Sequence, residues 1–398
     1  MSSYTSKAFV YHSPGDVRLE EMRIGCSSTD IMVKILASAR CGTDRTIFYK
    51  GHPKVDSHSP IVLGHELVGE IVEVGKDVSK LKDGIGYKEG ERLSDEYLNF
   101  QIGERVTFQS RIARYYHSLM LLQRPITILS FYINGGYSQY MRIPQALTLS
   151  GSVLRIPDNI SNEEAALVEP AACALESIFS TPHPVRLDGE GRHFFRGGIK
   201  KGGFSFVIGS GSVSMIYARF CRIEGAKKVF ILVRSQEKAH LVKKVLGEAT
   251  VPVIHPPYNE KSISEKEKIE NDLVENLKDL TNGHLFDDII VACSDTDAQR
   301  LMLRIYNPEG YAAGACFGGA HEKVDKVDMD QHHYHAAKTI GTSGCSTKTM
   351  ETIISWLKEG KLSLKGFTSS RKYSLATDPQ EFFTTEADGL KPVLYPWD

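Results

Sequence analysis

The sequence predicts an α/β protein of two domains, a mostly-β domain followed by a doubly wound parallel sheet. Its 398 residues exceed what one hydrophobic core usually serves. Residues 1 to about 150 contain short strand-like segments separated by Gly and Pro, with little helical periodicity. Beyond Ser161, strand and helix patterns alternate, which favours parallel strands joined by right-handed crossovers.

The first domain is expected to consist of apolar strands bounded by turn residues. The clearest strand segments are KAFVYH (7–12), IMVKILASAR (31–40) and ELVGEIVEVG (66–75). The stretch from residue 88 to residue 136 is irregular, and its pattern does not indicate which elements it forms. A helix then leads into the second domain, because Ser161 and Glu164 form a capping box and the apolar residues up to Phe179 recur at helical spacing.

The second domain is expected to contain buried strands that alternate with helices. Its strand segments are FSFVIG (204–209), KKVFILV (227–233), DDIIVAC (287–293) and GYAAGACFG (310–318). After residue 330 come KTIGTSG, a helical pattern at METIISWLKEG and a final strand at KPVLYP. We assign this tail to the first domain or to its interface with the second. The predicted first domain comprises residues 1–170 and 330–398, and the second comprises residues 171–329.

The composition excludes several classes of partner. The formal net charge of −1 predicts neither a nucleic-acid-binding surface nor a polybasic membrane patch, and small-molecule substrates fit better. No secretory signal opens the sequence, and no apolar run has transmembrane length. Seven cysteines without a CxxC pair argue against a disulfide framework. We therefore predict a cytoplasmic protein.

A glycine-containing turn follows the first strand of the second domain. Gly209, Ser210, Gly211, Ser212 and Val213 form a Rossmann-type turn, with a serine at the third glycine position of the pattern. Such a turn lets the backbone approach a pyrophosphate at the N-terminus of the next helix. The alternative is an ordinary strand-to-helix turn, but the strand and helix on either side favour a dinucleotide site.

The end of the next strand bears on the choice of cofactor. An NAD site usually has an acidic residue there, which binds the ribose hydroxyls. This sequence has Arg234 and Ser235 instead, which can bind a 2′-phosphate by charge-assisted hydrogen bonds. We predict NADP as the cofactor, with NAD possible, although a solvated arginine at a strand end is the alternative reading of Arg234.

Four residues offer ligands to a metal ion. Cys41, His65, Glu66 and Glu169 supply a thiolate, an imidazole and two carboxylates, a set that suits catalytic Zn²⁺. Taken singly, each has a structural alternative: a buried cysteine, a hydrogen-bonded turn histidine or a solvated carboxylate. Spacing alone does not show that they meet.

Several motifs resemble those of the medium-chain dehydrogenase/reductase superfamily, in particular of its zinc-dependent alcohol and polyol dehydrogenases. They are CGTD, LGHELVGEIVEVG, NGGYSQY and VEP, followed by the glycine turn. The resemblance implies a GroES-like catalytic domain and a Rossmann nicotinamide-binding domain. It also implies that Cys41 and His65 bind catalytic zinc, and that Glu66 or Glu169 binds it directly or through water.

The resemblance assigns further roles around the metal. Asp44 matches the carboxylate that orients the zinc-binding histidine, and Thr43 matches the hydroxyl that takes the substrate proton. Thr46 stands where many members have a relay histidine, so proton delivery is expected to run through Thr46, ordered water or another group. Residues 67–172 contain no cysteine, so we predict one zinc ion and no structural zinc. We include Glu66 among the catalytic residues.

Three segments are similar to those of bacterial L-sorbose-1-phosphate reductases. They are IGTSGCSTKTMETIISWLKEGKL, VEPAACAL and NGGYSQYMRIP. This resemblance implies reduction of a ketose 1-phosphate to an alditol phosphate, and a homodimer or homotetramer. Two alternatives remain: a zinc polyol or secondary-alcohol dehydrogenase acting on an unphosphorylated substrate, and a catalytically impaired binding protein on the same scaffold.

Overall fold

The computed structural model describes residues 2–81, 94–112, 126–127, 129–255, 261–316, 329–386 and 388–398. The chain divides into two compact units. The first unit consists of Met1–Ala172 and Cys345–Asp398, and the second of Cys173–Gly344. The division falls within helix α7 (Val168–Phe179).

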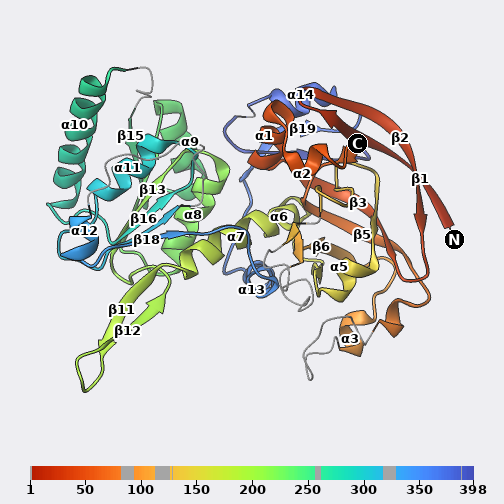
Figure 1. Ribbon diagram of the computed structural model, residues 1–398, viewed down its shortest axis with the longest axis horizontal. Helices are drawn as coiled ribbons and strands as arrows, with labels where there is room; N and C mark the ends of the chain where they lie inside the picture. The colour runs from red at the N-terminus through yellow and green to blue at the C-terminus, as the bar shows by residue number, and fades with distance from the viewer. Residues whose placement is uncertain are drawn as a thin grey trace. The chain divides into compact units, whose positions relative to one another are not determined.

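The first unit is mostly β-structure (Figure 1). One sheet of this unit has three strands in the order β2-β1-β4. They are β1 (Ser2–Ser13), β2 (Asp16–Cys26) and β4 (Ile61–Val62). Its larger sheet has the order β10-β6-β5-β3-β20-β19, and β9 also pairs with β3. These strands are β3 (Ile31–Ala39), β5 (Glu66–Val74), β6 (Arg105–Phe108), β9 (Tyr140–Ile143), β10 (Val153–Arg155), β19 (Thr368–Tyr373) and β20 (Lys391–Leu394). A short pair comprises β7 (Arg111–Ile112) and β8 (Ile126–Thr127).

The register of strand β3 brings distant segments together. Ala39 pairs with Glu66 of β5 and with Val393 of β20, both in antiparallel fashion. The end of β3, the start of β5 and the last strand of the chain therefore meet at one place. As a result, the CGTD segment, the GHE segment and the C-terminal strand lie close in space.

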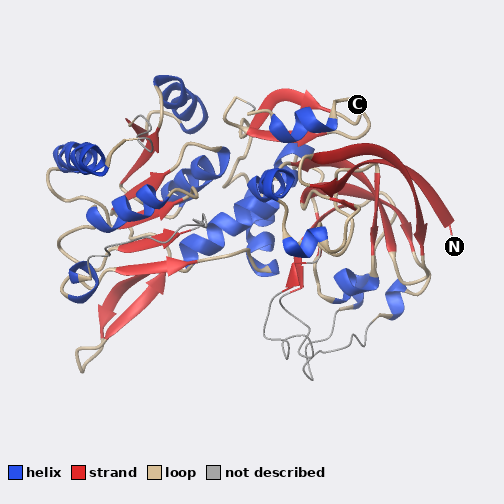
Figure 2. Ribbon diagram, turned by 45° about the horizontal axis from the view of Figure 1, so that its top comes forward, coloured by secondary structure: helices blue, strands red, loops and turns tan. Residues whose placement is uncertain are grey.

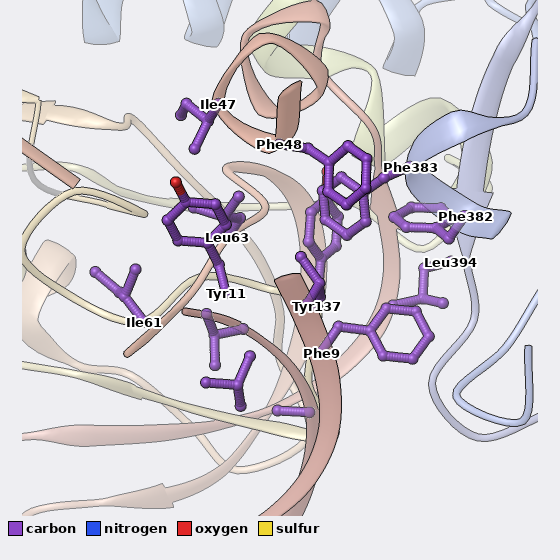
Figure 3. Close-up of a cluster of buried hydrophobic side chains, with 14 of the residues drawn as sticks. Phe9, Tyr11, Ile47, Phe48, Ile61, Leu63, Tyr137, Phe382, Phe383 and Leu394 are labelled. Carbon is purple, nitrogen blue, oxygen red and sulfur yellow. The ribbon is translucent and has the colours of Figure 1, made fainter. Parts of the chain in front are cut away.

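An aromatic core fixes this part of the first unit (Figure 3). Tyr137 is fully buried, and its ring centroid lies 5.1 Å from that of Phe382 and 5.7 Å from that of Phe383. Phe48 stacks on Phe383 at 5.3 Å. Burial of each such side chain contributes roughly 1.5–3 kcal/mol, so the core anchors the helix that contains Phe48 against the C-terminal segment.

Short helices complete the first unit. They are α1 (Gly42–Lys50), α2 (Pro53–Asp56), the 3₁₀ turn η1 (Val78–Lys80), α3 (Asp95–Leu98), α5 (Gln145–Leu149), α6 (Asn162–Ala166), α13 (Thr347–Lys358) and α14 (Pro379–Thr384).

The second unit is a parallel sheet with crossover helices (Figure 2). In its described part the strand order is β15-β14-β13-β16-β17-β18, which in chain order is 3-2-1-4-5-6. The strands are β13 (Phe204–Ile208), β14 (Lys228–Val233), β15 (Thr250–Ile254), β16 (Asp288–Val291), β17 (Ala313–Cys316) and β18 (Lys338–Gly341). This is the doubly wound order, in which the strand order reverses between the parallel neighbours β13 and β16, the place where such sheets bind ligands.

The helices of the second unit connect these strands. They are α8 (Ser212–Ile223), α9 (Gln236–Leu246), α10 (Ile263–Thr281), α11 (Thr296–Arg304) and α12 (Asp330–His333). A hairpin of β11 (Pro182–Leu187) and β12 (His193–Gly197) extends away from the sheet (Figure 1). None of the described helices has the length and apolarity needed to cross a membrane.

Two details differ from the sequence predictions. Strand β18 pairs with β17, so residues up to Gly344 belong to the second unit, and the predicted boundary at residue 330 lies too early. The helix predicted after Ser161 is split into α6 and α7. Helix α6 ends at Ala166, Leu167 is its C-cap, and α7 begins at Val168. Ser161 nevertheless caps α6, accepting a hydrogen bond from the Glu164 N–H at 3.2 Å. The irregular stretch from residue 88 to 136 contains α3, β6, β7 and β8, and its residues 88–93, 113–125 and 128 lie outside the described residues.

Candidate active site

The end of β3 positions Cys41. Cys41 is the N-cap of α1, and its Sγ accepts a hydrogen bond of 3.4 Å from the Thr43 N–H. Asp44 completes the cap from inside the helix, since its Oδ2 accepts from the Cys41 N–H at 3.2 Å. The first turn of α1 thus fixes the thiol and the carboxylate relative to each other.

Asp44 is fully buried behind His65. Its Oδ1 lies 3.5 Å from His65 Nδ1, and its Oδ2 accepts a 2.5 Å hydrogen bond from the Tyr137 hydroxyl. Gly64 makes room for this arrangement, because a Cβ at that position would lie 2.7 Å from the Tyr137 ring and the backbone φ is +95°. With Nδ1 turned toward Asp44, the ring nitrogen left to meet a ligand is Nε2.

Glu66 is held by a buried lysine. Lys391 Nζ donates to Glu66 Oε1 at 2.6 Å, and the two side chains are 4% and 1% exposed. The second carboxylate oxygen, Oε2, is also buried and has no hydrogen-bond partner in the described part of the chain. Such an orphaned buried oxygen is costly unless a further group binds it.

Cys41, His65 and Glu66 form one cluster. One potential ligand atom from each lies within 4.8 Å of the other two. A thiolate, an imidazole and a carboxylate that converge in this way are a donor set suited to a catalytic zinc ion, with a carboxylate orienting the histidine from behind. The orphaned Glu66 Oε2 also fits a metal at this place.

Glu169 is not in the same tight group. Ser110 donates to its Oε1 at 3.2 Å, and a carboxylate oxygen of Glu169 lies within 4.8 Å of the Cys345 sulfur. Its negative charge still acts on both Glu66 and Lys391. Three of the four predicted ligands, Cys41, His65 and Glu66, therefore converge. The fourth, Glu169, lies beside Cys345 and acts on the cluster through its charge.

The two threonines of α1 have different environments. Thr46 donates from Oγ1 to the Gly42 carbonyl of its own helix at 3.1 Å. Thr43 is exposed at the start of the helix, beside the cluster residue Cys41. The hydroxyl proton of Thr46 is thus engaged within the helix, as is common for helical threonine.

Burial and neighbouring charges decide the protonation of this region. Burial alone would raise the pKa of Asp44, but His65, Tyr137 and the Cys41 N–H outweigh it and lower that pKa. Burial alone would lower the pKa of Lys391, but the negative charges of Glu66 and Cys41 outweigh it and raise that pKa. Asp44 is therefore held as a carboxylate and Lys391 as an ammonium.

The glycine turn of the second unit lies between β13 and α8. Gly209 has φ +134°, and a Cβ there would lie 2.6 Å from Ser214 Oγ. Ser214, at the third glycine position of the pattern, is buried. Gly211 is the N-cap of α8 and provides no side-chain cap, while Ser212 and Val213 begin the helix. The half-buried Ser210 completes the turn.

Arg234 and Ser235 follow β14 as expected, but both already have partners. Arg234 Nη2 donates to Asp295 Oδ2 at 2.9 Å. Ser235 is the N-cap of α9, and its Oγ accepts from the Lys238 N–H at 3.3 Å. Its hydroxyl proton is still free to be donated, since the cap uses only a lone pair.

Several residues around the two sites were missed by the sequence analysis. They are Tyr137, Lys391, Cys345 and Asp295. Tyr137 lies in the quoted NGGYSQY motif and Lys391 begins the predicted KPVLYP strand, so both segments were recognised without a role for these side chains. No local signal joins residue 391 to residue 66 or residue 295 to residue 234.

Comparison with known proteins bears on the family. Residues 27–86 match the family described as the alcohol dehydrogenase GroES-like domain. The chain is 24% identical over 244 residues to (R,R)-butanediol dehydrogenase of Bacillus subtilis, an alignment that covers 58% of this chain and 59% of that protein. The chain thus contains a segment that is similar to the GroES-like domain of alcohol dehydrogenases.

Solved structures match the fold along nearly the whole chain. A putative zinc-binding dehydrogenase from Sinorhizobium meliloti 1021, solved bound to NADP, has a TM-score of 0.74 at 19% identity, covering 99% of this chain and 100% of that one. Galactitol-1-phosphate dehydrogenase from Escherichia coli has a TM-score of 0.68 at 19% identity, covering 98% and 100%. The predicted fold, a GroES-like domain with a Rossmann parallel sheet, is confirmed.

The alignments with curated relatives are partial. They span 52–59% of the length of the first four, which are the butanediol dehydrogenase and three L-threonine 3-dehydrogenases. All four of these relatives are dehydrogenases.

Proposed function

We propose that this protein is a zinc-dependent reductase that moves a hydride between a nicotinamide cofactor and a sugar-like ketone or its alcohol. The observation that carries the proposal is the buried cluster of Cys41, His65 and Glu66, with Asp44 behind the histidine. A metal ion at this place would bind Glu66 Oε2, which is buried and has no hydrogen-bond partner among the described residues.

Cys41, His65 and Glu66 are the proposed ligands of one zinc ion. When bound, zinc supplies Lewis-acid stabilisation of the substrate oxygen as charge develops on it. Asp44 keeps His65 oriented, and Lys391 balances the negative charge of Glu66. Glu169 is proposed to act from the surrounding shell, because its charge reaches Glu66 and Lys391 while its carboxylate lies beside Cys345.

Proton transfer is proposed to involve Thr43 rather than Thr46. Thr43 is exposed next to Cys41, so its hydroxyl can meet a substrate oxygen. Thr46 already donates its proton to the Gly42 carbonyl. Replacement of Thr43 by Val should therefore lower kcat more than replacement of Thr46 by Val, and equal effects would argue against this assignment.

The proposed cofactor is NADP, bound at the Gly209–Val213 turn. The uncapped N-terminus of α8 can bind the pyrophosphate, and Arg234 and Ser235 can bind the 2′-phosphate. The cofactor supplies the hydride. Replacement of Arg234 by Asp should shift the binding preference from NADPH toward NADH.

The finer proposal for the substrate is a ketose 1-phosphate, such as L-sorbose 1-phosphate. Arg45 supports it, because its Nε is buried and has no hydrogen-bond partner among the described residues, while its Nη2 reaches Glu386 at 3.1 Å. A guanidinium on the same helix as Asp44 can bind an anionic substrate group.

We further propose a cytoplasmic homodimer or homotetramer. The six cysteines whose side chains are described are all free, as expected in a reducing compartment. In the described part of the second unit, β18 ends the parallel sheet and leaves an edge available for pairing.

The proposed function is tested by a reduction screen. NADPH and NADH oxidation would be followed with ketoses and with their 1-phosphates, beside butanediol and polyols in the reverse direction. Turnover of a ketose 1-phosphate but not of the free ketose is the expected result. Turnover of free polyols alone would support the unphosphorylated alternative, and dinucleotide binding without any turnover would support a catalytically impaired protein.

A further inference from the structure

An ion pair crosses the end of the strand that precedes the glycine turn. Ile208, the last residue of β13, pairs with Leu232 of β14 on one side and with Val291 of β16 on the other. Arg234 follows the first of these neighbours and Asp295 follows the second. Their 2.9 Å contact therefore links the two loops on either side of the Gly209–Val213 turn.

Asp295 is the fixed partner of this pair. It is the N-cap of α11, and its Oδ1 accepts from the Asp297 N–H at 2.9 Å while its Oδ2 accepts from Arg234. Its side chain is 18% exposed. Arg234 is 40% exposed and has no second hydrogen bond or ion pair within the described ranges, so its guanidinium is the part that can turn toward a ligand.

The ion pair of Arg234 with Asp295 brings a carboxylate to the end of β14, where the local sequence has no acidic residue. The end of β14 lacks the acidic residue of a usual NAD site, but Asp295 brings one beside Arg234 from the loop after β16. A 2′-phosphate bound by Arg234 would lie close to this carboxylate and be repelled by it. A ribose 2′-hydroxyl, in contrast, could donate a hydrogen bond to it.

We propose that Asp295 determines the cofactor preference of this protein, by holding Arg234 in the free state and by opposing a 2′-phosphate. The inference rests on the nicotinamide cofactor proposed above. Asp295 thus limits the gain in NADP affinity that Arg234 provides. Removal of the Asp295 charge should turn a modest preference for NADP over NAD into a strong one.

The test compares Asp295→Asn with a matched control. Asparagine is nearly isosteric and is itself a good N-cap, so α11 should keep its cap. Asp297→Asn removes one negative charge from the same helix, but Asp297 faces Lys266 and Arg300 rather than Arg234. Dissociation constants for NADPH and NADH would be measured by fluorescence titration of the three full-length proteins.

We expect Asp295→Asn to raise the ratio of the NADH to the NADPH dissociation constant about tenfold, since a like charge beside the phosphate is removed. The Asp297→Asn control should leave the ratio within about twofold of wild type. A ratio that is unchanged or lowered in Asp295→Asn would overturn the inference while leaving cofactor binding intact. Binding of neither dinucleotide by the wild type would instead refute the proposed function itself.

Discussion

Lys391 and Glu66 form an ion pair that is almost completely removed from water. Both side chains are at most 4% exposed. Charges in such a place are tolerated because each neutralises the other, and loss of one partner leaves an uncompensated buried charge. Oε2 of Glu66 has no hydrogen-bond partner among the described residues, so we include the pair in the proposed metal site.

Replacement of Lys391 by Met should destabilise the metal-free protein by about 3–5 kcal/mol, because Glu66 would remain buried without its counter-charge. Urea unfolding followed by circular dichroism measures this change in the free energy of unfolding. Lys391→Arg, which keeps the charge, is the control and should lose less. A loss below about 1 kcal/mol for Lys391→Met would show that Glu66 is neutral or solvated.

Asp287 is a second buried charge, in the second unit, that makes stability depend on pH. Its Oδ1 accepts from Lys200 Nζ at 2.6 Å and from Asn307 Nδ2 at 2.8 Å, and its Oδ2 accepts from the Phe204 N–H at 2.8 Å. Burial alone would raise the pKa of Asp287, but these three donors outweigh it and lower that pKa. A carboxyl with a lowered folded-state pKa stabilises the fold above its unfolded pKa, near 3.9.

Replacement of Asp287 by Asn should therefore cost about 2 kcal/mol of unfolding free energy at pH 7, the scale of a hydrogen bond to a charged group. The difference from wild type should shrink as the pH falls below about 4, because the wild-type carboxyl then becomes protonated in both states. Chemical unfolding at pH 7 and near pH 3 provides the measurement. A difference that is independent of pH would contradict the charged state assigned to Asp287.

At the scale of elements, the turn between β13 and α8 offers a matched pair of glycines. Gly209 has a left-handed backbone and faces Ser214 Oγ, whereas Gly211 has φ −83° and open space around its Cβ position. The sequence pattern treats both as members of one motif. The structure shows that only Gly209 is required by sterics, so any need for glycine at position 211 would come from a bound ligand.

Replacement of Gly209 by Ala should lower the free energy of unfolding by about 1–3 kcal/mol, because of the strained φ and the clash with Ser214. Gly211→Ala should cost less than about 1 kcal/mol. Thermal unfolding of both variants compares the two positions directly. Equal losses would mean that the backbone of this turn differs from the one described.

Local patterns predicted the elements well where the chain is apolar and periodic. Strands β13, β14 and β16 are buried on both faces and therefore appear in the sequence as continuous apolar runs. The break between α6 and α7 was not predictable, because the helical spacing of apolar residues continues through Leu167. Strand β18 was assigned to the wrong domain because its four residues carry no signal of the sheet that they join.

For the whole molecule, the alternation of strands and helices was enough to predict the fold class, since few topologies satisfy it. The site was predicted only in part. Cys41, His65 and Glu66 lie near the ends of paired strands, and their meeting follows from the register of β3 and β5. Lys391 and Asp295 reach their partners across 325 and 61 residues, and no periodicity in a sequence encodes such distances.

The measurement that tests the central claim most directly is the zinc content of the purified protein, beside that of Cys41→Ser and of Cys26→Ser, which replaces a buried cysteine outside the cluster. We predict about one zinc ion per wild-type chain by mass spectrometry, retained in Cys26→Ser, lost in Cys41→Ser, and required for the oxidation of NADPH by a ketose substrate. Full reductase activity in wild-type protein stripped of zinc would contradict the account.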